Sequence, residues 1–393
     1  MWPSISYETQ RWDRDYDELM LIPRSRRRKI LPTYESAVPA KIAGLTPELS
    51  PELSRRMAEV EVLLARFDQE QRSRDYNLPA LMLRSESSSS SQIECLTSSA
   101  RNIALAELTD QTPGNARLIA ANAAAMRSAL NQDGPLCIDS ICRIHDELVN
   151  GADEATGLRN EQVWIGGTSF SPHGADFVPP HSSRVPECLD DLLAFGRRED
   201  VSPIAKAAVF HAQFETIHPF TDGNGRTGRA LIHRMLADDG LLTCTALPIS
   251  AGLLHNVNEY MDALDYYHEG MVRPIVEQLT DALELAVAVG SQFARKIDLV
   301  VEAWRDATTE CKGSAAHRLP ALLVEHPVVN ATFVASNLEV TERAARNLID
   351  SACEKGILTK TGNARRGAFY QASALLEVIE EASDIKSIRR MAR

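Results

Sequence analysis

The chain has 393 residues, of which 44% are hydrophobic, and carries a formal net charge of −12 at pH 7. This length suits two or three domains with their own cores. The excess of acidic residues excludes a long-range attraction of the whole molecule to nucleic acid or to an anionic membrane.

Cysteines and hydropathy bound the class of protein further. The seven cysteines are scattered and form no Cys-x-x-Cys pair, which favours reduced thiols over a disulfide framework or a zinc site. No secretory leader is recognisable, and no apolar stretch approaches the roughly 20 residues that cross a bilayer. We therefore expect a cytoplasmic protein without a membrane partner.

The N-terminal third mixes irregular and helical patterns. The first forty or so residues hold four prolines and are predicted to be irregular, and the basic run 24–29 is interpreted as a solvated surface. Apolar spacing over 54–68 predicts a helix with one buried face. The serine tract 85–91 has two interpretations: a flexible linker, or the start of a short helix that continues into Gln92-Ile93-Glu94.

The middle of the chain is predicted to be helical with one hairpin. Helical spacing covers about 115–150 and ends near Gly151. Strand-like runs at 162–165 and 177–180, joined by Gly, Ser and Pro, predict a β-hairpin that projects from the helices. Further helices are expected at 187–196, 203–217, 226–239, 257–269 and 272–305. The expected fold class is mainly α.

The last third changes character. Between residues 312 and 372 there are eight Lys or Arg against five Asp or Glu, although the whole chain is acidic. Three expected helices (317–325, 331–337 and 341–355) precede two short strands (357–360 and 368–371) around a loop with Gly362 and Gly367. This order is typical of a winged helix-turn-helix.

The segment from His218 to Arg229 carries the clearest chemistry. His218 ends the inward stripe of its helix, and the turn Asp222-Gly-Asn-Gly225 can direct successive N–H groups toward a phosphate at the next helix N-terminus. Arg226 and Arg229 stand three apart on one side of that helix and would add a cationic clamp. Asp222 offers an oxygen ligand for Mg²⁺, and His218 can act as a general base near neutral pH. The set suits phosphoryl or nucleotidyl transfer.

This segment resembles the Fic-family signature His-x-Phe-x-Asp/Glu-Gly-Asn-Gly-Arg-x-x-Arg at each fixed position. The resemblance implies a Fic-type helical bundle with a β-hairpin flap and transfer of AMP from ATP to a Ser, Thr or Tyr hydroxyl of a target protein. It assigns the base to His218 and the Mg²⁺ ligand to Asp222. It assigns the nucleotide phosphates to the following positions: Gly223, Asn224, Gly225, Arg226, Thr227, Gly228 and Arg229.

The resemblance extends to a flap and to an inhibitory helix. Val163, Trp164, Ile165 and Gly166 resemble the flap that covers the nucleotide and aligns the target segment by strand addition. Ser90 and Glu94 resemble the inhibitory pattern Ser/Thr-x-x-x-Glu-Gly/Asn, although Cys95 departs from its final position. Glu94 would pair with Arg229 and deny the γ-phosphate its partner.

A second departure lies downstream of the signature. His268 stands before Glu269-Gly270, where the family often has Asn near the adenine, so the nucleotide preference stays open. The implied domains are an N-terminal region with the inhibitory helix (1–110), a catalytic core (111–305) and a winged helix (312–375).

Several alternatives stay open. The same site could remove AMP, with Glu94 positioning water, and self-modification and a homodimer are further options. Phosphotransfer, as in the death-on-curing relatives, is disfavoured because Gly225 is present. A different class is a nucleotide-sensing regulator that binds DNA, or a protein partner, through the helix carrying Arg343 and Arg346.

Overall fold

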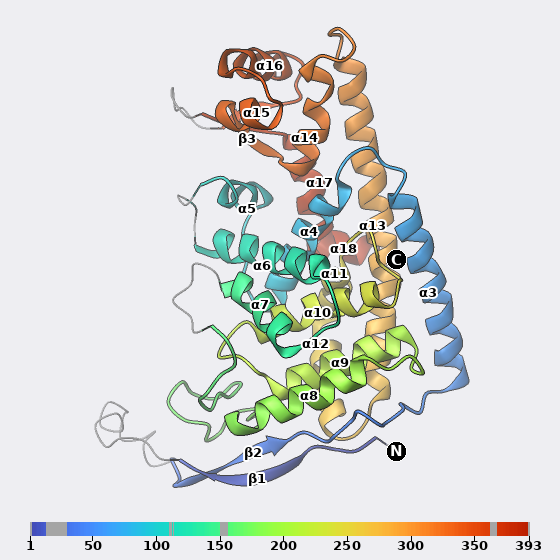
Figure 1. Cartoon of the computed structure of the whole chain (residues 1–393), viewed down its shortest axis with the longest axis vertical. Coiled ribbons are helices and arrows are strands. Elements are labelled where there is room, and N and C mark those ends of the chain that lie inside the picture. The colour runs from blue at the N-terminus through green and yellow to red at the C-terminus, as the bar shows by residue number, and fades with distance from the viewer. Residues whose placement is uncertain are drawn as a thin grey trace.

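A computed structural model describes residues 2–12, 30–109, 112, 114–149, 156–361 and 368–391 (Figure 1). The basic run 24–29 and the glycines at 151, 362 and 367 lie outside these residues. In the part of the chain that is described, no helix has the length and apolarity needed to cross a bilayer. Most of the described structure is helical, as the periodicity predicts.

The sequence prediction was wrong for the N-terminal segment, which forms two strands. Strands β1 (Ser6–Arg11) and β2 (Thr33–Val38) pair antiparallel, with Ser6 opposite Val38 and Arg11 opposite Thr33, where irregular chain was expected. Both strands are short and largely polar, so the alternation of apolar and polar residues that predicts a strand is weak. The two strands are also far apart in the sequence. The backbone N–H of Ala37 donates to the carbonyl of Val178 (2.9 Å), which attaches β2 to the predicted flap region.

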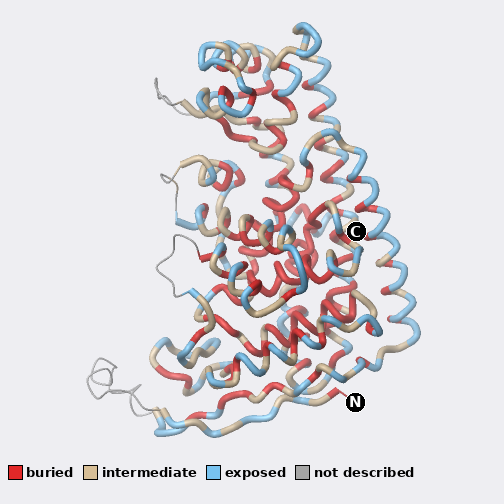
Figure 2. The backbone as a smooth tube through the Cα atoms, viewed as in Figure 1, coloured by how far each residue is buried: buried red, intermediate tan, exposed pale blue. Residues whose placement is uncertain are grey.

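Two long helices border the molecule on one side (Figure 1). Helix α3 (Pro51–Gln71) begins at Ser50, whose hydroxyl accepts a hydrogen bond from the Leu53 N–H (3.2 Å). It packs along α13 (Arg273–Ala307), which has 35 residues. The tube in Figure 2 shows buried positions concentrated on the helices inside this border, whereas much of α3 is exposed.

The serine tract is neither a linker nor the start of a helix. Helix α4 (Leu78–Ile93) begins at Asn77, and residues 85–91 lie buried in its middle and last turns. Small side chains let α4 pack closely against α6 (Gly114–Asn131) and α11 (Ile249–His255). Serine hydroxyls inside a helix can bond to nearby carbonyls, and the Ser87 hydroxyl donates to the carbonyl of Ile119 (2.5 Å).

The remaining helices of the bundle surround α4 and α9. The expected stretch 115–150 divides into α6 and α7 because residues 132–137 form a turn between them. The other helices are α5 (Ala100–Ala106), α7 (Ile138–Val149), α8 (Val185–Gly196), α9 (Pro203–Ile217), α10 (Asn224–Asp238) and α12 (Val257–His268). Short 3-10 turns lie at Ser182–Arg184 and Ala315–His317.

The C-terminal unit follows the predicted order of helices, with one additional strand. It comprises α14 (Leu319–Glu325), β3 (Val328–Asn330), α15 (Ala331–Asn337), α16 (Glu342–Glu354), β4 (Thr359–Thr361) and β5 (Phe369–Gln371). The three strands form an antiparallel sheet in the order β3-β5-β4. The name winged helix for this unit stays a prediction.

Two helices at the C-terminal end were not predicted, and neither were α5 and α11. Helices α17 (Ser373–Ser383) and α18 (Ile385–Met391) leave the C-terminal sheet and return to the bundle, where α17 packs on α4 and α13. The Gln92 side-chain amide donates to the carbonyl of Ser383 (3.0 Å). The expected boundary at residue 375 therefore falls inside α17, and the last turn of α4 is held by the C-terminal segment.

Candidate active site

His218 stands at the end of α9, with a left-handed backbone (φ 51°, ψ 62°) that stops the helix. Its N–H still bonds to the carbonyl of Phe214 (2.9 Å), so the chain turns away only after this residue. The imidazole Nδ1 lies 3.3 Å from the carbonyl of Glu215. When Nδ1–H donates to that carbonyl, Nε2 carries the free lone pair and can accept a proton.

A buried arginine holds this helix end. Arg159 is 4% exposed and donates from Nε to the carbonyl of His218 (2.8 Å) and from Nη2 to the carbonyls of Pro180 (2.6 Å) and Ile217 (3.3 Å). Sequence reasoning missed Arg159, because a single arginine before a strand-like run gives no sign that it caps a helix 58 residues further along. Its role is to position the backbone that presents His218.

Electrostatics keep the imidazole neutral. Burial, and then the nearby charge of Arg159, lower the pKa of His218 to about 4. A histidine with this pKa is unprotonated at neutral pH, which is the form that a general base needs.

The loop after His218 is built by its own side chains. The Asn224 side chain accepts from the Phe220 N–H (2.9 Å) and donates to the Phe220 carbonyl (2.9 Å). Phe220 is fully buried and stacks on His145 (3.7 Å between ring centroids), whose Nε2 lies 3.0 Å from the Asp222 carbonyl. The Asn224 amide therefore fixes the loop, and only its backbone is left for a ligand. His145 is a further support that the sequence did not reveal.

A glycine precedes helix α10 because the chain at this position comes close to α7. Gly223 precedes the helix with φ 76°, and a Cβ at this position would lie 2.8 Å from the Leu148 side chain. The N-terminal N–H groups of α10 then open beside His218 and Asp222, in the arrangement that binds anions. Thr227 is buried within the same turn, and its N–H bonds back to the Gly223 carbonyl (3.0 Å).

Both arginines of the signature contact one carboxylate. The Oε2 atom of Glu94 lies 2.8 Å from Nε of Arg226, and its Oε1 atom accepts from Nη2 of Arg229 (2.7 Å). Arg229 also donates to the hydroxyl (2.8 Å) and the carbonyl (2.9 Å) of Ser90. The structure thus brings together the two predicted regulatory residues and the predicted clamp, and it adds Arg226 as a second partner of Glu94.

The close approach of Glu94 depends on Gly225. A Cβ at this position would lie 2.6 Å from Oε1 of Glu94 and 2.9 Å from Nη1 of Arg229. The missing side chain of Gly225 therefore makes room for the Glu94 carboxylate and the Arg229 guanidinium.

The backbone at the end of α4 shows why the family pattern has Gly or Asn after the glutamate, where this chain has Cys95. Cys95 has φ 61°, its N–H bonds to the Gln92 carbonyl (2.9 Å), and the Leu96 N–H bonds to the Ser91 carbonyl (2.9 Å). These two bonds form a Schellman motif, whose left-handed position normally takes Gly or Asn. Cys95 adopts that backbone despite its Cβ, and Glu94 still reaches both arginines.

Most of the predicted site residues line one cavity of about 740 Å³, whereas Ser90, Thr227 and Gly228 are not among its lining residues. The predicted residues among its lining are His218, Asp222, Gly223, Asn224, Gly225, Arg226, Arg229 and Glu94. Further lining residues come from α12 and the flap region: Tyr260, Met261, Leu264, Asp265, His268, Trp164, Ile165, Asp176 and Phe177. This size lies within the range of small-molecule sites.

The predicted flap is present in a reduced form. Ile165 and Phe177 form an antiparallel bridge, in which the Ile165 N–H donates to the Phe177 carbonyl (2.8 Å). Trp164 and Ile165 line the cavity, whereas Val163 and Gly166 of the predicted set do not. Gly166 lies beneath the Asp176 carboxylate with φ 74°. Trp164 is held by a ring contact with Trp12 (5.6 Å).

His268 stands at the end of α12, at the position where the Fic family often has Asn. Its ring stacks on Phe177 (4.4 Å between centroids), and its Nε2 lies 3.1 Å from the Thr216 hydroxyl. Burial lowers the pKa of His268, so the ring offers a neutral face to the cavity.

A buried carboxyl behind the arginines escaped the sequence analysis. Burial raises the pKa of Glu215 to about 7, and the charge of Arg229 acts in the opposite direction. Gly228 packs directly against this carboxyl, since a Cβ there would lie 2.5 Å from Oε1 of Glu215. The sequence places Glu215 on the inward stripe of α9 but gives no sign of its proximity to Arg229.

Asp222 is suited to hold a cation together with phosphate oxygens. Its side chain is 60% exposed, and its only near charge among the described residues is Nη2 of Arg226 at 3.3 Å. No cluster of three or more metal-ligating side chains occurs within the described part of the chain. Mg²⁺ commonly uses one or two carboxylates and completes its shell with water and phosphate oxygens, so one carboxylate fits this role.

Comparison with known proteins identifies the class. Residues 135–236 match the Fic/DOC family. A probable protein adenylyltransferase of Aquifex aeolicus (strain VF5) is 33% identical over 138 residues, which make up 35% of this chain and 38% of that protein. The protein adenylyltransferase fic-1 of Caenorhabditis elegans is 29% identical over 154 residues, or 39% of this chain and 28% of that protein.

A solved structure agrees at the level of the fold. A Fic family protein from Desulfovibrio desulfuricans G20 superposes with a TM-score of 0.53 at 20% identity and covers 83% of this chain and 97% of its own. Residues 135–236 thus match the Fic/DOC family, and the mainly helical fold is similar to that of a Fic family protein. The chain spans less than two fifths of the length of the two curated relatives.

Proposed function

We propose that this chain transfers AMP from ATP to a Ser, Thr or Tyr hydroxyl of a protein and that Glu94 inhibits the transfer. The observation that carries the proposal is the convergence of His218, Asp222, Arg226 and Arg229 on one cavity. The relatives named protein adenylyltransferase support the same activity. Incubation with labelled ATP, followed by a search for AMP-modified protein, tests it.

Each of these residues has a separate role in the proposed reaction. Nε2 of His218 accepts the proton of the target hydroxyl, whose oxygen forms a bond to the α-phosphorus of ATP. The bond from that phosphorus to the bridging oxygen breaks, and pyrophosphate leaves. Arg226 and Arg229 are placed to neutralise the departing phosphates, and the N–H groups at the start of α10 hold the phosphates in line. Mg²⁺ held at Asp222 would neutralise further phosphate charge.

The flap supplies the target site in this account. Trp164 and Ile165 line the cavity, and an extended segment of the target could add as a strand beside them. Ile165 is 41% exposed, so a target side chain could pack on it. Self-modification uses the same chemistry, with a segment of a second copy as the target.

The DNA-binding alternative receives less support. Arg346 on α16 is ion-paired with Glu342 (2.6 Å) on the same helix, which reduces its availability for phosphate. The predicted basic loop of the wing lies outside the described residues. We therefore keep the enzyme as the proposed function, and the role of the C-terminal unit stays a prediction.

Asp222→Ala should lower transfer by at least about 100-fold and abolish its dependence on Mg²⁺, because metal stabilisation of phosphate charge contributes several kcal/mol. Transfer measured across a Mg²⁺ titration, with and without EDTA, tests this. Asp238→Asn is the matched control, since Asp238 pairs with Arg234 at the far end of the same helix. Unchanged transfer after chelation would refute the metal assignment.

Cys95→Gly should tighten inhibition. A left-handed non-glycine residue costs roughly 1–2 kcal/mol, and the extra chain entropy of glycine offsets about 0.5–1 kcal/mol of the gain. We expect basal transfer to fall by up to about fivefold, because a net 1 kcal/mol corresponds to that factor. Cys95→Ala is the control, since it removes the thiol but keeps the Cβ. Equal basal transfer in both variants would show that the helix end does not limit release.

A further inference from the structure

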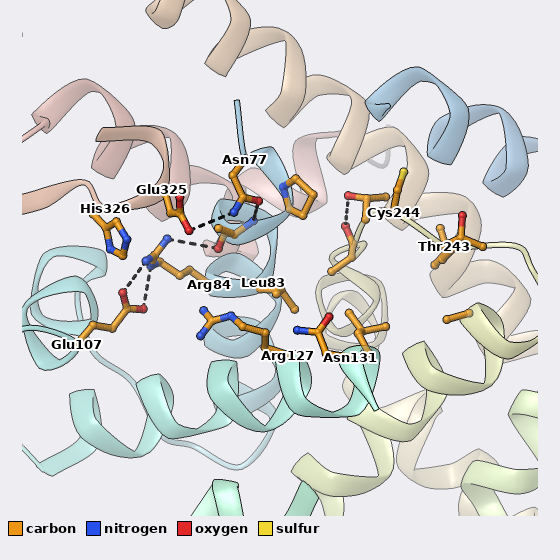
Figure 3. Close-up of a pocket in the computed structure, with 17 residues that line it drawn as sticks. Asn77, Leu83, Arg84, Glu107, Arg127, Asn131, Thr243, Cys244, Glu325 and His326 are labelled. Atoms are coloured by element: carbon orange, nitrogen blue, oxygen red, sulfur yellow. Dashed lines mark hydrogen bonds and ion pairs between the residues drawn. The ribbon is translucent and has the colours of Figure 1, made fainter. Parts of the chain in front are cut away.

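A second cavity of about 560 Å³ lies at the other end of α4 from Glu94 (Figure 3). Its walls come from the first turns of α4, from α6, from the loop after α10 and from the end of α14 in the C-terminal unit. Among the described residues, the lining of this cavity has no member in common with that of the His218 cavity. On α4, the nearest lining residues of the two cavities are Arg84 and Ile93, so about 14 Å of helix separates them.

The two carboxylates of this cavity each accept hydrogen bonds from a neighbouring side chain. Both oxygens of the Glu107 carboxylate accept from Arg84, at 3.0 Å from Nε and 2.5 Å from Nη2, and Arg84 is only 2% exposed. Oε1 of Glu325 accepts from the Asn77 amide (3.2 Å). Figure 3 shows these pairs on the side of the cavity where α4 meets α14.

Three donor groups have no such partner. Within the described part of the chain, no hydrogen bond or ion pair engages the side chain of Arg127, Asn131 or His326. Figure 3 shows Arg127 and Asn131 side by side on α6, and His326 at the end of α14 beside the Arg84–Glu107 pair. Burial, and then the charge of Arg84, lower the pKa of His326, so its neutral ring offers one N–H donor and one acceptor.

The floor of the cavity is apolar and buried. Leu83, Leu242 and Ala246 are each at most 7% exposed, whereas Arg127 and Asn131 stand at the exposed rim. A ligand that fits this arrangement has an acceptor-rich group at the rim and a small organic body on the floor. A guanidinium forms paired hydrogen bonds with phosphate and carboxylate, which makes an anion the natural partner of Arg127.

We propose that this cavity binds a small organic anion bearing a phosphate or a carboxylate. Arg127 holds the anionic group, Asn131 and His326 add neutral hydrogen bonds, and the apolar floor accepts the rest of the molecule. The volume lies within the range of about 300–1,000 Å³ seen for small-molecule sites. The ligand would contact both the bundle and the C-terminal unit.

Calorimetric titration of the full chain with glycerol 3-phosphate and, separately, with citrate tests this site. Arg127→Gln should weaken binding of at least one probe by about ten- to a hundredfold, the range for loss of a charge-assisted bond of roughly 1.5–3 kcal/mol. Arg117→Gln is the matched control, because Arg117 is an exposed arginine on the same helix and does not line this cavity. Loss of the phosphate probe alone identifies a phosphate ligand, and loss of citrate alone identifies a carboxylate.

A second variant tests the site while keeping the charge of Arg127. Asn131→Asp places a carboxylate one helical turn from Arg127, where it competes for the guanidinium, and should weaken the same probe. Circular dichroism confirms that each variant is folded. The proposal is overturned if neither probe binds, or if each probe binds equally to the unmodified chain, Arg127→Gln and Asn131→Asp, since any binding would then belong to another anion site such as the start of α10.

Discussion

His218→Ala is expected to lower AMP transfer by roughly 10² to 10⁴-fold, the contribution of a general base, while ATP binding stays largely intact. The imidazole takes no part in binding the phosphates in this account, because the N–H groups of α10 and the two arginines do so. Transfer is measured with labelled ATP, and binding by titration with ATP. Near-normal transfer by the variant would contradict the assignment of the base.

The backbone at position 218 makes a second substitution informative. His218 has φ 51°, a conformation that Asn adopts more readily than Ala. His218→Asn therefore removes the base while sparing the helix end, and its transfer should fall as far as that of His218→Ala. His317→Ala, at an exposed histidine of the C-terminal unit, serves as the control and should leave transfer unchanged.

Glu94→Gly is expected to raise transfer roughly ten- to a hundredfold. One carboxylate contacts both Arg226 and Arg229 in the structure, so its removal frees the groups that would hold the β- and γ-phosphates. A hydrogen bond to a charged group contributes about 1.5–3 kcal/mol, which corresponds to that range of rates. Self-modification of the variant and of the unmodified chain is compared at equal ATP.

Two controls separate charge from helix flexibility. Glu94→Ala removes the carboxylate without adding the conformational freedom of glycine, and it should activate to a similar degree. Glu94→Gln keeps the size and a hydrogen bond to Arg229 but loses the charge, and it should activate less. If Glu94→Gly leaves transfer unchanged or lower, Glu94 does not hold the site shut, and AMP removal that depends on Glu94 becomes the better account. Release of AMP from pre-modified protein then decides.

The contiguous part of the site could be predicted from the sequence because its geometry is local. His218, Asp222 and the two arginines lie within twelve residues, and a helix end, a glycine turn and a helix start suffice to bring them together. Ser90 and Glu94 were predicted by resemblance alone. Their contact with Arg229 spans more than 130 residues, which no local pattern encodes.

What the sequence could not predict depends on partners far along the chain. The serine tract reads as polar and flexible, and only the packing of α6 and α11 on both sides shows why it is a buried helix. Arg159 donates to the carbonyl of His218, which lies far along the chain. The carboxyl of Glu215 lies near the guanidinium of Arg229 on the following helix. Most of α17 and all of α18 lie beyond the expected end of the last domain at residue 375, and the contact of α17 with α4 is visible only in the folded chain.

Transfer of AMP to a protein hydroxyl at the His218 site leaves a product that labelled ATP can identify. The most direct measurement incubates the Glu94→Gly chain, with and without His218→Ala, with Mg²⁺ and ATP labelled on either the α- or the γ-phosphorus. We expect α-label bound to protein, a mass increase equal to one AMP on a Ser, Thr or Tyr residue, no γ-label, and loss of the adduct with His218→Ala. Protein carrying the γ-label, or no adduct in the Glu94→Gly chain when target proteins from a lysate are present, would contradict this expectation.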